Sequence, residues 1–152
     1  MKILLVEDVT NKAQRICNCI YNAFLDSEII IKESYHSASV EIVKHHQDYD
    51  IVLLDMSMPS YDSSEEESGG VPEAIAGRRI LEKMFLKEIT TKVIVVTMYD
   101  KFEGEKLVEM DKSFQETYKD FYYGYVFFSF ENADWQLQLI KMIKDYEQNF
   151  NR

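Results

Sequence analysis

Five short runs of apolar residues recur along the chain, and each is followed by a segment whose apolar residues recur at intervals of three and four. Runs of this kind, rich in aliphatic or aromatic residues, are typical of strands buried on both faces of a parallel sheet. Intervals of three and four align apolar side chains on one face of a helix. The pattern predicts strands at 3–6, 28–33, 51–54, 92–97 and 124–128, and helices at 10–24, 37–47, 73–87, 103–120 and 132–150.

Strict alternation of strand and helix indicates an α/β fold, in which helices cover both faces of a parallel sheet. Right-handed crossovers leave few topologies, and the simplest is a doubly wound five-stranded sheet of order 2-1-3-4-5. We expect one domain over 1–152, with no output domain. An acidic stretch without periodicity at about 60–72 predicts a flexible insertion.

Charge and composition exclude several classes of protein. The net charge of -10 argues against direct binding of nucleic acid. No apolar run approaches the roughly 20 residues that span a bilayer, and the first residues are too soon acidic for a signal peptide, so we expect a cytoplasmic protein. Cys17 and Cys19 lack the spacing of a redox pair or a zinc site, which favours buried small apolar residues.

Carboxylates follow two of the predicted strands where each strand leaves the core. Glu7 and Asp8 follow the first strand and Asp55 follows the third, while Thr97 ends the fourth. In the predicted order these strand ends are neighbours, at the edge where α/β sheets bind ligands. Clustered carboxylates hold protons or a cation, and an all-oxygen set suits Mg²⁺ or Mn²⁺. A carboxylate beside such a cation can attack phosphorus and form an acyl phosphate.

These motifs resemble the receiver domain of two-component response regulators, and the resemblance extends over nearly the whole chain. The stretches that carry it are Glu7-Asp8, Asp55-x-x-Met58-Pro59, Val95-Val96-Thr97 and Gly124-Tyr125-Val126. The resemblance implies a flavodoxin-like fold and Mg²⁺-dependent transfer of a phosphoryl group from a histidine kinase or a phosphotransfer protein. It implies no enzyme acting on a separate substrate, and at most self-catalysed transfer and dephosphorylation.

Carried over position by position, the resemblance assigns roles to six residues. Asp55 would be the phosphoacceptor, Thr97 would hydrogen-bond the phosphoryl group, and Tyr125 would be the aromatic residue that moves with Thr97. The implied metal ligands are Glu7, Asp8, Asp55 and the backbone carbonyl of Ser57.

The fifth strand departs from the family pattern. Receivers carry Lys and Pro three and four residues after the switch aromatic, whereas this chain has Phe128 and Ser129. The family's Lys pairs with the phosphoryl group and the acceptor carboxylate, so its loss removes a charge-assisted contact. Lys101 lies four residues after Thr97. Its side chain could reach into the site or be exposed to solvent, and the sequence leaves both alternatives open. Met98 replaces the usual small residue after the switch Thr and narrows access to the acceptor.

Two interpretations of these departures stay open. In one, Asp55 is phosphorylated and the signal passes by an altered route. In the other, the chain is a pseudo-receiver, a protein-binding module that acts without phosphorylation. A phosphatase of the haloacid dehalogenase type is disfavoured, because Ser57 stands where those enzymes carry a second Asp.

In either case we expect signalling by protein contact. The resemblance places a downstream target or a second copy of the chain on the face formed by the helices at 103–120 and 132–150. Surplus aromatic residues near this face, Tyr122 among them, predict an outward-facing patch.

Overall fold

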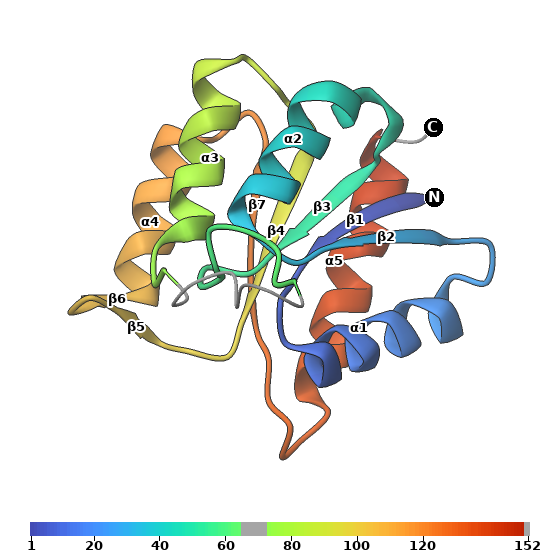
Figure 1. Ribbon diagram of the computed structural model, residues 1–152. Coiled ribbons are helices and arrows are strands. Elements are labelled where there is room, and N and C mark those ends of the chain that lie inside the picture. Colours follow the sequence, from blue (N-terminus) through green and yellow to red (C-terminus); the bar gives the residue numbers. More distant parts are fainter. Residues whose placement is uncertain (65–72, 151–152) are drawn as a thin grey trace.

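A sheet of five parallel strands forms the centre of the computed structural model, which describes residues 1–64 and 73–150 (Figure 1). Its strands are β1 (Lys2–Val6), β2 (Glu28–Lys32), β3 (Ile51–Leu54), β4 (Lys92–Thr97) and β7 (Tyr122–Phe127). They lie in the order β2-β1-β3-β4-β7, so that β7 is the fifth strand of the sheet. The predicted α/β fold and the strand order 2-1-3-4-5 are confirmed.

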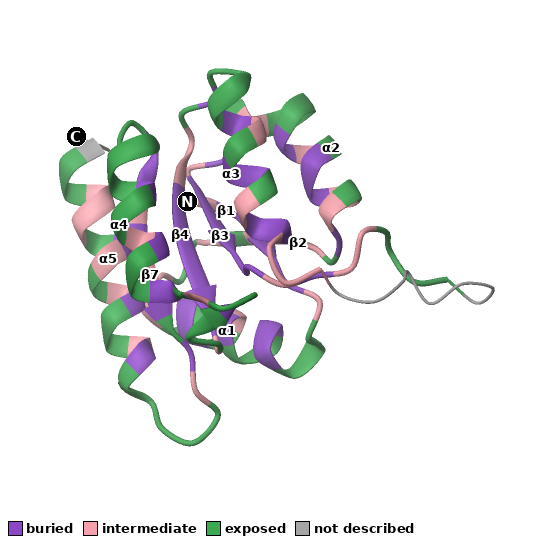
Figure 2. Ribbon diagram, turned by 90° about the vertical axis from the view of Figure 1, so that its left-hand side faces the viewer, coloured by how far each residue is buried: buried purple, intermediate pink, exposed green. Residues whose placement is uncertain are grey.

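Helices cover both faces of this sheet, as continuous apolar strands require. On one face α1 (Thr10–Ala23) and α5 (Asp134–Phe150) pack over a core that includes Ile3, Leu5 and Leu53. On the other face α2 (Tyr35–His45), α3 (Ala76–Leu86) and α4 (Leu107–Thr117) enclose a second core. A short 3-10 helix, η1 (His46–Asp48), follows α2. Figure 2 shows that the strands at the centre are buried while the outer helix faces are exposed.

Hydrogen bonding moves two predicted helix starts. The predicted helix at 37–47 begins at Tyr35, because Ser34 caps it: the Ser34 hydroxyl accepts a hydrogen bond from the backbone N–H of Ser37 at 3.1 Å, and Ser37 completes a reciprocal capping box. The predicted helix at 73–87 begins only at Ala76, because Glu73 instead pairs with Met58 in an isolated antiparallel bridge. The first helix, α1, begins at Thr10 as predicted, and Val9 at its cap position makes no side-chain cap.

The prediction of one long helix over 103–120 is wrong at its start. Two short antiparallel strands, β5 (Lys101–Phe102) and β6 (Glu105–Lys106), form a hairpin before α4. The turn places Glu103 and Gly104 at φ of 52° and 83°, values that a helix does not contain. An ion pair of 2.8 Å between Arg78 and Glu105 ties the hairpin to α3.

The fifth strand begins at Tyr122, two residues before the prediction, which corrects the expected outward position of that side chain. Tyr122 is buried, and its hydroxyl donates a hydrogen bond of 2.6 Å to Asp111. Cys19 is buried as expected, whereas Cys17 is half-buried. Residues 65–72 of the predicted acidic insertion lie outside the described residues, and its first residues run beside α2, where Asp62 accepts a hydrogen bond from Ser37. Among the described residues no helix is both long and apolar enough to cross a bilayer.

Candidate functional site

The carboxyl ends of β1, β3 and β4 meet at one edge of the sheet. Strand register sets Val6 beside Leu54, and Leu54 beside Val95, so the residues that follow these strands emerge together. The backbone N–H of Asp55 donates to the carbonyl of Val6 at 3.1 Å, which carries the pairing one residue beyond β3. The strand register therefore fixes where Asp55 lies relative to Glu7.

Three carboxylates converge at this edge, as the sequence predicted. One oxygen from each of Glu7, Asp8 and Asp55 lies within 4.8 Å of the others. Glu7 and Asp55 are buried, with 1% and 4% of their surface exposed, and Asp8 is half-buried. A buried all-oxygen cluster is compatible with a divalent cation of the Mg²⁺ or Mn²⁺ type.

Burial strongly affects the electrostatics of the carboxylates. Desolvation, and then the charge of Asp55, raise the pKa of Glu7 to about 8, while the ammonium of Lys12 lowers it. Desolvation also raises the pKa of Asp8. Backbone donors offset part of this cost: the N–H of Val9 donates to Glu7 Oε1 at 3.0 Å, and the N–H of Met56 donates to Asp55 Oδ1 at 2.8 Å. Burial and the neighbouring charge of Asp55 thus disfavour the ionised forms of Glu7 and Asp8, and a bound cation would favour those forms.

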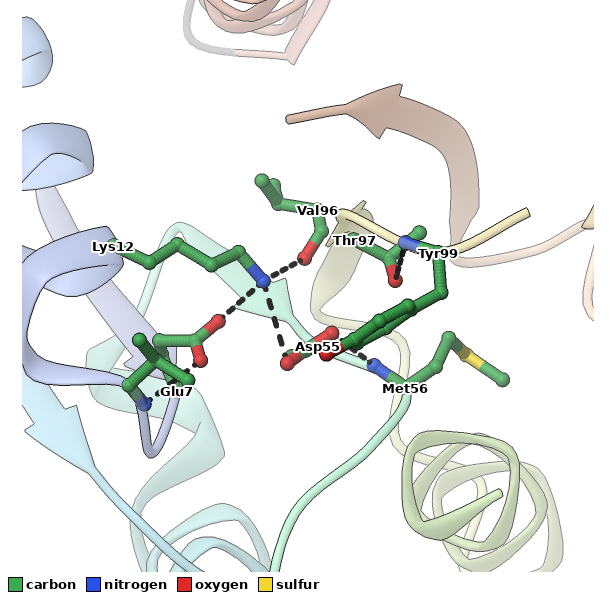
Figure 3. Close-up of polar contacts among 8 residues, drawn as sticks. Glu7, Lys12, Asp55, Met56, Val96, Thr97 and Tyr99 are labelled. Carbon is green, nitrogen blue, oxygen red and sulfur yellow. Dashed lines mark hydrogen bonds and ion pairs between the residues drawn. The ribbon is translucent and has the colours of Figure 1, made fainter. Parts of the chain in front are cut away.

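Lys12 is the site residue that the sequence pattern did not bring forward. Its ammonium lies 2.5 Å from Glu7 Oε2 and 3.3 Å from Asp55 Oδ2, and it donates a hydrogen bond of 2.9 Å to the carbonyl of Val96 (Figure 3). The side chain is wholly buried. Lys12 stands four residues before the buried Ile16, so helical spacing places it on the inner face of α1, and this signal was available in the sequence.

The hydroxyl-bearing and aromatic residues of the prediction come from neighbouring strands. Thr97 is buried at the end of β4, and its hydroxyl accepts a hydrogen bond of 3.4 Å from the N–H of Tyr99 (Figure 3). Tyr125 is half-buried on β7, paired with Val95, and it packs against the core beneath α4. Ser57 is half-buried, two residues beyond Asp55.

Phe128 is buried rather than open to the acidic cluster. Its N–H donates to the carbonyl of Thr97 at 2.8 Å, and its ring packs against Trp135 with ring centroids 4.6 Å apart. The ammonium of Lys12 lies 5.8 Å from the centroid of the Phe128 ring. Lys101 is exposed on the hairpin, and Met98 is half-buried. Phe128 therefore forms an apolar wall beside Lys12.

No protein-family model matches the chain, but two curated proteins do. The Detocs response regulatory protein DtcB of Enterobacter cloacae is 31% identical over 150 residues, covering 95% of this chain and 99% of that protein. The uncharacterised protein y4jR of Sinorhizobium fredii is 26% identical over 142 residues, covering 90% of this chain and 92% of that protein.

Solved structures with the same fold include two with similar coverage. The signal receiver domain of a LuxO repressor protein from Vibrio parahaemolyticus aligns with a TM-score of 0.64 and 19% identity, covering 97% of this chain and 92% of that one. The Mn²⁺-bound form of the response regulator Rcp1 aligns with a TM-score of 0.57 and 21% identity, covering 98% of this chain and 93% of that one.

Proposed function

This chain belongs to the receiver family of response regulators, and from that membership we propose that it accepts a phosphoryl group on Asp55 and signals by protein contact. One observation carries the proposal: Glu7, Asp8 and Asp55 converge at the carboxyl end of the sheet, where Thr97 ends the neighbouring strand β4. Asp55 is held by a backbone hydrogen bond to one carboxylate oxygen, Oδ1. That arrangement orients the other oxygen, Oδ2, as the nucleophile.

A divalent cation fits this set of donors. Glu7, Asp8, Asp55 and the backbone carbonyl of Ser57 would hold it, and the Mn²⁺-bound relative Rcp1 has the same fold. When bound, such an ion neutralises charge on a transferring phosphoryl group and aligns that group for attack. Burial is the main cause of the raised pKa values of Glu7 and Asp8, the charge of Asp55 is a further cause, and a bound cation would favour the ionised forms of both carboxylates.

The chemical step belongs to Asp55. A carboxylate oxygen of Asp55 forms a bond to phosphorus while the bond between phosphorus and the donor's imidazole nitrogen breaks. The imidazole leaves as the neutral ring, since its other nitrogen carries a proton. Thr97 then donates a hydrogen bond to a phosphoryl oxygen, and Tyr125 follows the movement of Thr97. We propose no activity on a separate substrate, only this self-catalysed transfer and the later hydrolysis at Asp55.

The proposed partners are a sensor histidine kinase or a phosphotransfer protein upstream, and a protein target downstream. The face of α4 and α5 carries exposed apolar side chains on both helices, with Val108 54% and Leu137 75% exposed. A homodimer through this face is the form of assembly that the family membership suggests. Tyr122 is buried and plays no part in that surface.

A second candidate is a pseudo-receiver that acts without phosphorylation. Phe128 favours it, because this buried ring stands where the family carries its Lys. The intact mass of the protein, measured after incubation with acetyl phosphate and Mg²⁺, separates the two candidates. We expect a gain of one phosphoryl group that requires the metal and is lost in Asp55→Asn.

The exposed Asp100, three residues beyond Thr97, provides a matched control, and Asp100→Asn should keep the gain in mass. A wild-type protein that never gains mass, at saturating donor and Mg²⁺, would exclude self-catalysed transfer from acetyl phosphate and favour the pseudo-receiver.

A further inference from the structure

We infer that Lys12, reaching into the site from α1, binds the phosphoryl group on Asp55 and so replaces the Lys that is absent from the fifth strand. This inference rests on the proposed function, because it concerns the state in which Asp55 carries a phosphoryl group. Figure 3 shows the ammonium of Lys12 at the meeting point of β1, β3 and β4, with contacts to Glu7, Asp55 and Val96.

A buried ammonium is costly unless all its protons find partners. Lys12 has no exposed surface, and its three partners come from three different strand ends. The contacts to Glu7 and Val96 are short, at 2.5 and 2.9 Å, whereas Asp55 Oδ2 is 3.3 Å away. The ammonium is therefore firmly fixed on two sides, and its loosest contact is the one to the acceptor carboxylate.

That loose contact is where new charge would arrive. Phosphorylation replaces the single negative charge of the Asp55 carboxylate with about two on the phosphoryl group, and it brings three acceptor oxygens to the site. A proton of Lys12 that now faces Asp55 Oδ2 would then lie beside a phosphoryl oxygen, which is a stronger acceptor for a charge-assisted hydrogen bond. Val96 and Glu7 hold the ammonium in place, so little rearrangement is needed when that bond forms.

Charge balance supports the same role. Glu7, Asp8 and Asp55 carry three negative charges when ionised, and Lys12 together with one divalent cation would neutralise them. The divalent cation alone would leave one negative charge uncompensated. Adding a phosphoryl group would increase that deficit, so the incoming anion requires the ammonium as well as the metal.

The ring of Phe128 lies beside the ammonium of Lys12. Its centroid is 5.8 Å from the ammonium, and the ring is backed by the rings of Trp135 and Phe130. A ring at this position excludes water from the ammonium and contributes a modest cation–π attraction. The fifth strand thus supplies the apolar wall, and α1 supplies the positive charge.

The test compares Lys12→Met with Lys101→Met, a matched removal of an exposed lysine on the hairpin. With acetyl phosphate and Mg²⁺, Lys12→Met should gain its phosphoryl group about ten- to a hundredfold more slowly, as expected for loss of a charge-assisted hydrogen bond. Lys101→Met should match the wild type. Mn²⁺ binding, followed by the paramagnetic resonance of the free ion, should stay the same or tighten in Lys12→Met, because a positive charge has left the cluster.

Rescue separates a role in phosphoryl binding from a merely structural one. The double variant Lys12→Met with Phe128→Lys returns the ammonium from the fifth strand and should recover most of the rate. If Lys12→Met does not fold, Lys12→Gln gives the same comparison, because it keeps an N–H donor while removing the charge.

The outcomes distinguish this inference from the function on which it rests. A phosphorylated wild type with an equally fast Lys12→Met variant refutes the role of Lys12 alone. That role is equally refuted if the folded double variant stays as slow as the single one. A wild type that gains no phosphoryl group refutes the self-catalysed transfer on which the inference rests and, with it, the role of Lys12.

Discussion

Gly77 lies where the second residue of α3 passes the loop that carries Asp55, and its replacement by Ala sets two known effects against each other. In an open helix, Gly→Ala stabilises by roughly 1 kcal/mol, through helix propensity and a less disordered unfolded chain. At this site, however, an added Cβ would lie 2.5 Å from the carbonyl oxygen of Asp55 and 2.8 Å from the Cα of Met56. Both atoms belong to the backbone and cannot rotate away.

The steric effect should win. Overpacking against fixed atoms costs about 1–3 kcal/mol, and here it would also disturb the hydrogen bond of 2.9 Å from Gly77 N–H to the Met56 carbonyl. We therefore expect Gly77→Ala to lower the free energy of unfolding by about 1–2 kcal/mol. That corresponds to a melting temperature lower by roughly 3–6 °C for a domain of this size. Phosphorylation of Asp55 should slow as well, because the displaced loop carries the acceptor.

Urea unfolding followed by the fluorescence of Trp135 measures the change, with Gly104→Ala as the control. A Cβ at Gly104 meets no atom within 4 Å, so that variant reports only the strain of a φ of 83°. If Gly77→Ala were instead more stable than the wild type, the close approach of α3 to the Asp55 loop would be refuted, and with it the packing that positions the acceptor.

Four further measurements follow from the structure. Phe128→Ala should lower the free energy of unfolding by about 3–5 kcal/mol, since it empties a buried aromatic site, and a loss below about 1 kcal/mol in urea unfolding would contradict that packing. Mg²⁺ at about a hundred times its dissociation constant should stabilise the wild type by about 2.7 kcal/mol, measured by thermal melts. Asp8→Asn should be stabilised much less by Mg²⁺, and equal stabilisation of the two proteins would show that Asp8 is not a ligand. Burial, and then the hydrogen bond to Asp111, raise the pKa of Tyr122 above its ordinary value of 10.0. The stability that the neutral phenol contributes is therefore complete below pH 10 and declines above it, so Tyr122→Phe should decline less steeply in alkaline unfolding experiments; equal slopes would rule this out. Leu137→Asp should reduce the mass measured by light scattering if α5 forms a dimer face, and an unchanged dimer would exclude that surface.

The pattern of apolar runs was sufficient to predict the five-stranded sheet and the order of its strands. Continuous apolar runs predict strands of a sheet that helices cover on both faces. The run 51–54 is such a strand, and Asp55 follows it where the strand leaves the core. The convergence of Glu7, Asp8 and Asp55 followed from strand order alone. The prediction that failed concerned local structure, the start of the helix at 103–120. The hairpin there depends on positive φ angles at Glu103 and Gly104, and the spacing of apolar residues carries no information about backbone dihedral angles.

Lys12 escaped prediction for a different reason. A lysine near a helix start is ordinarily solvated, and only its spacing from Ile16 pointed inward. The opposite error concerned Tyr122, which was expected to face outward as one of the surplus aromatic residues, although its hydroxyl has a partner in Asp111. In both cases a polar group is buried because a specific partner from elsewhere in the chain satisfies it. A sequence pattern does not reveal such partners.

The reach of Lys12 from α1 to the end of β4 has a consequence for the history of the family. Charge on α1 and an aromatic wall on the fifth strand form one solution, while a lysine on the fifth strand forms another. Substitution of Lys12 alone removes the buried ammonium from the site, and substitution of Phe128 by lysine alone places two ammonium groups there. We therefore expect the residue types at positions 12 and 128 to covary among relatives. A relative with a lysine at the position of Phe128 should lack a lysine at the position of Lys12.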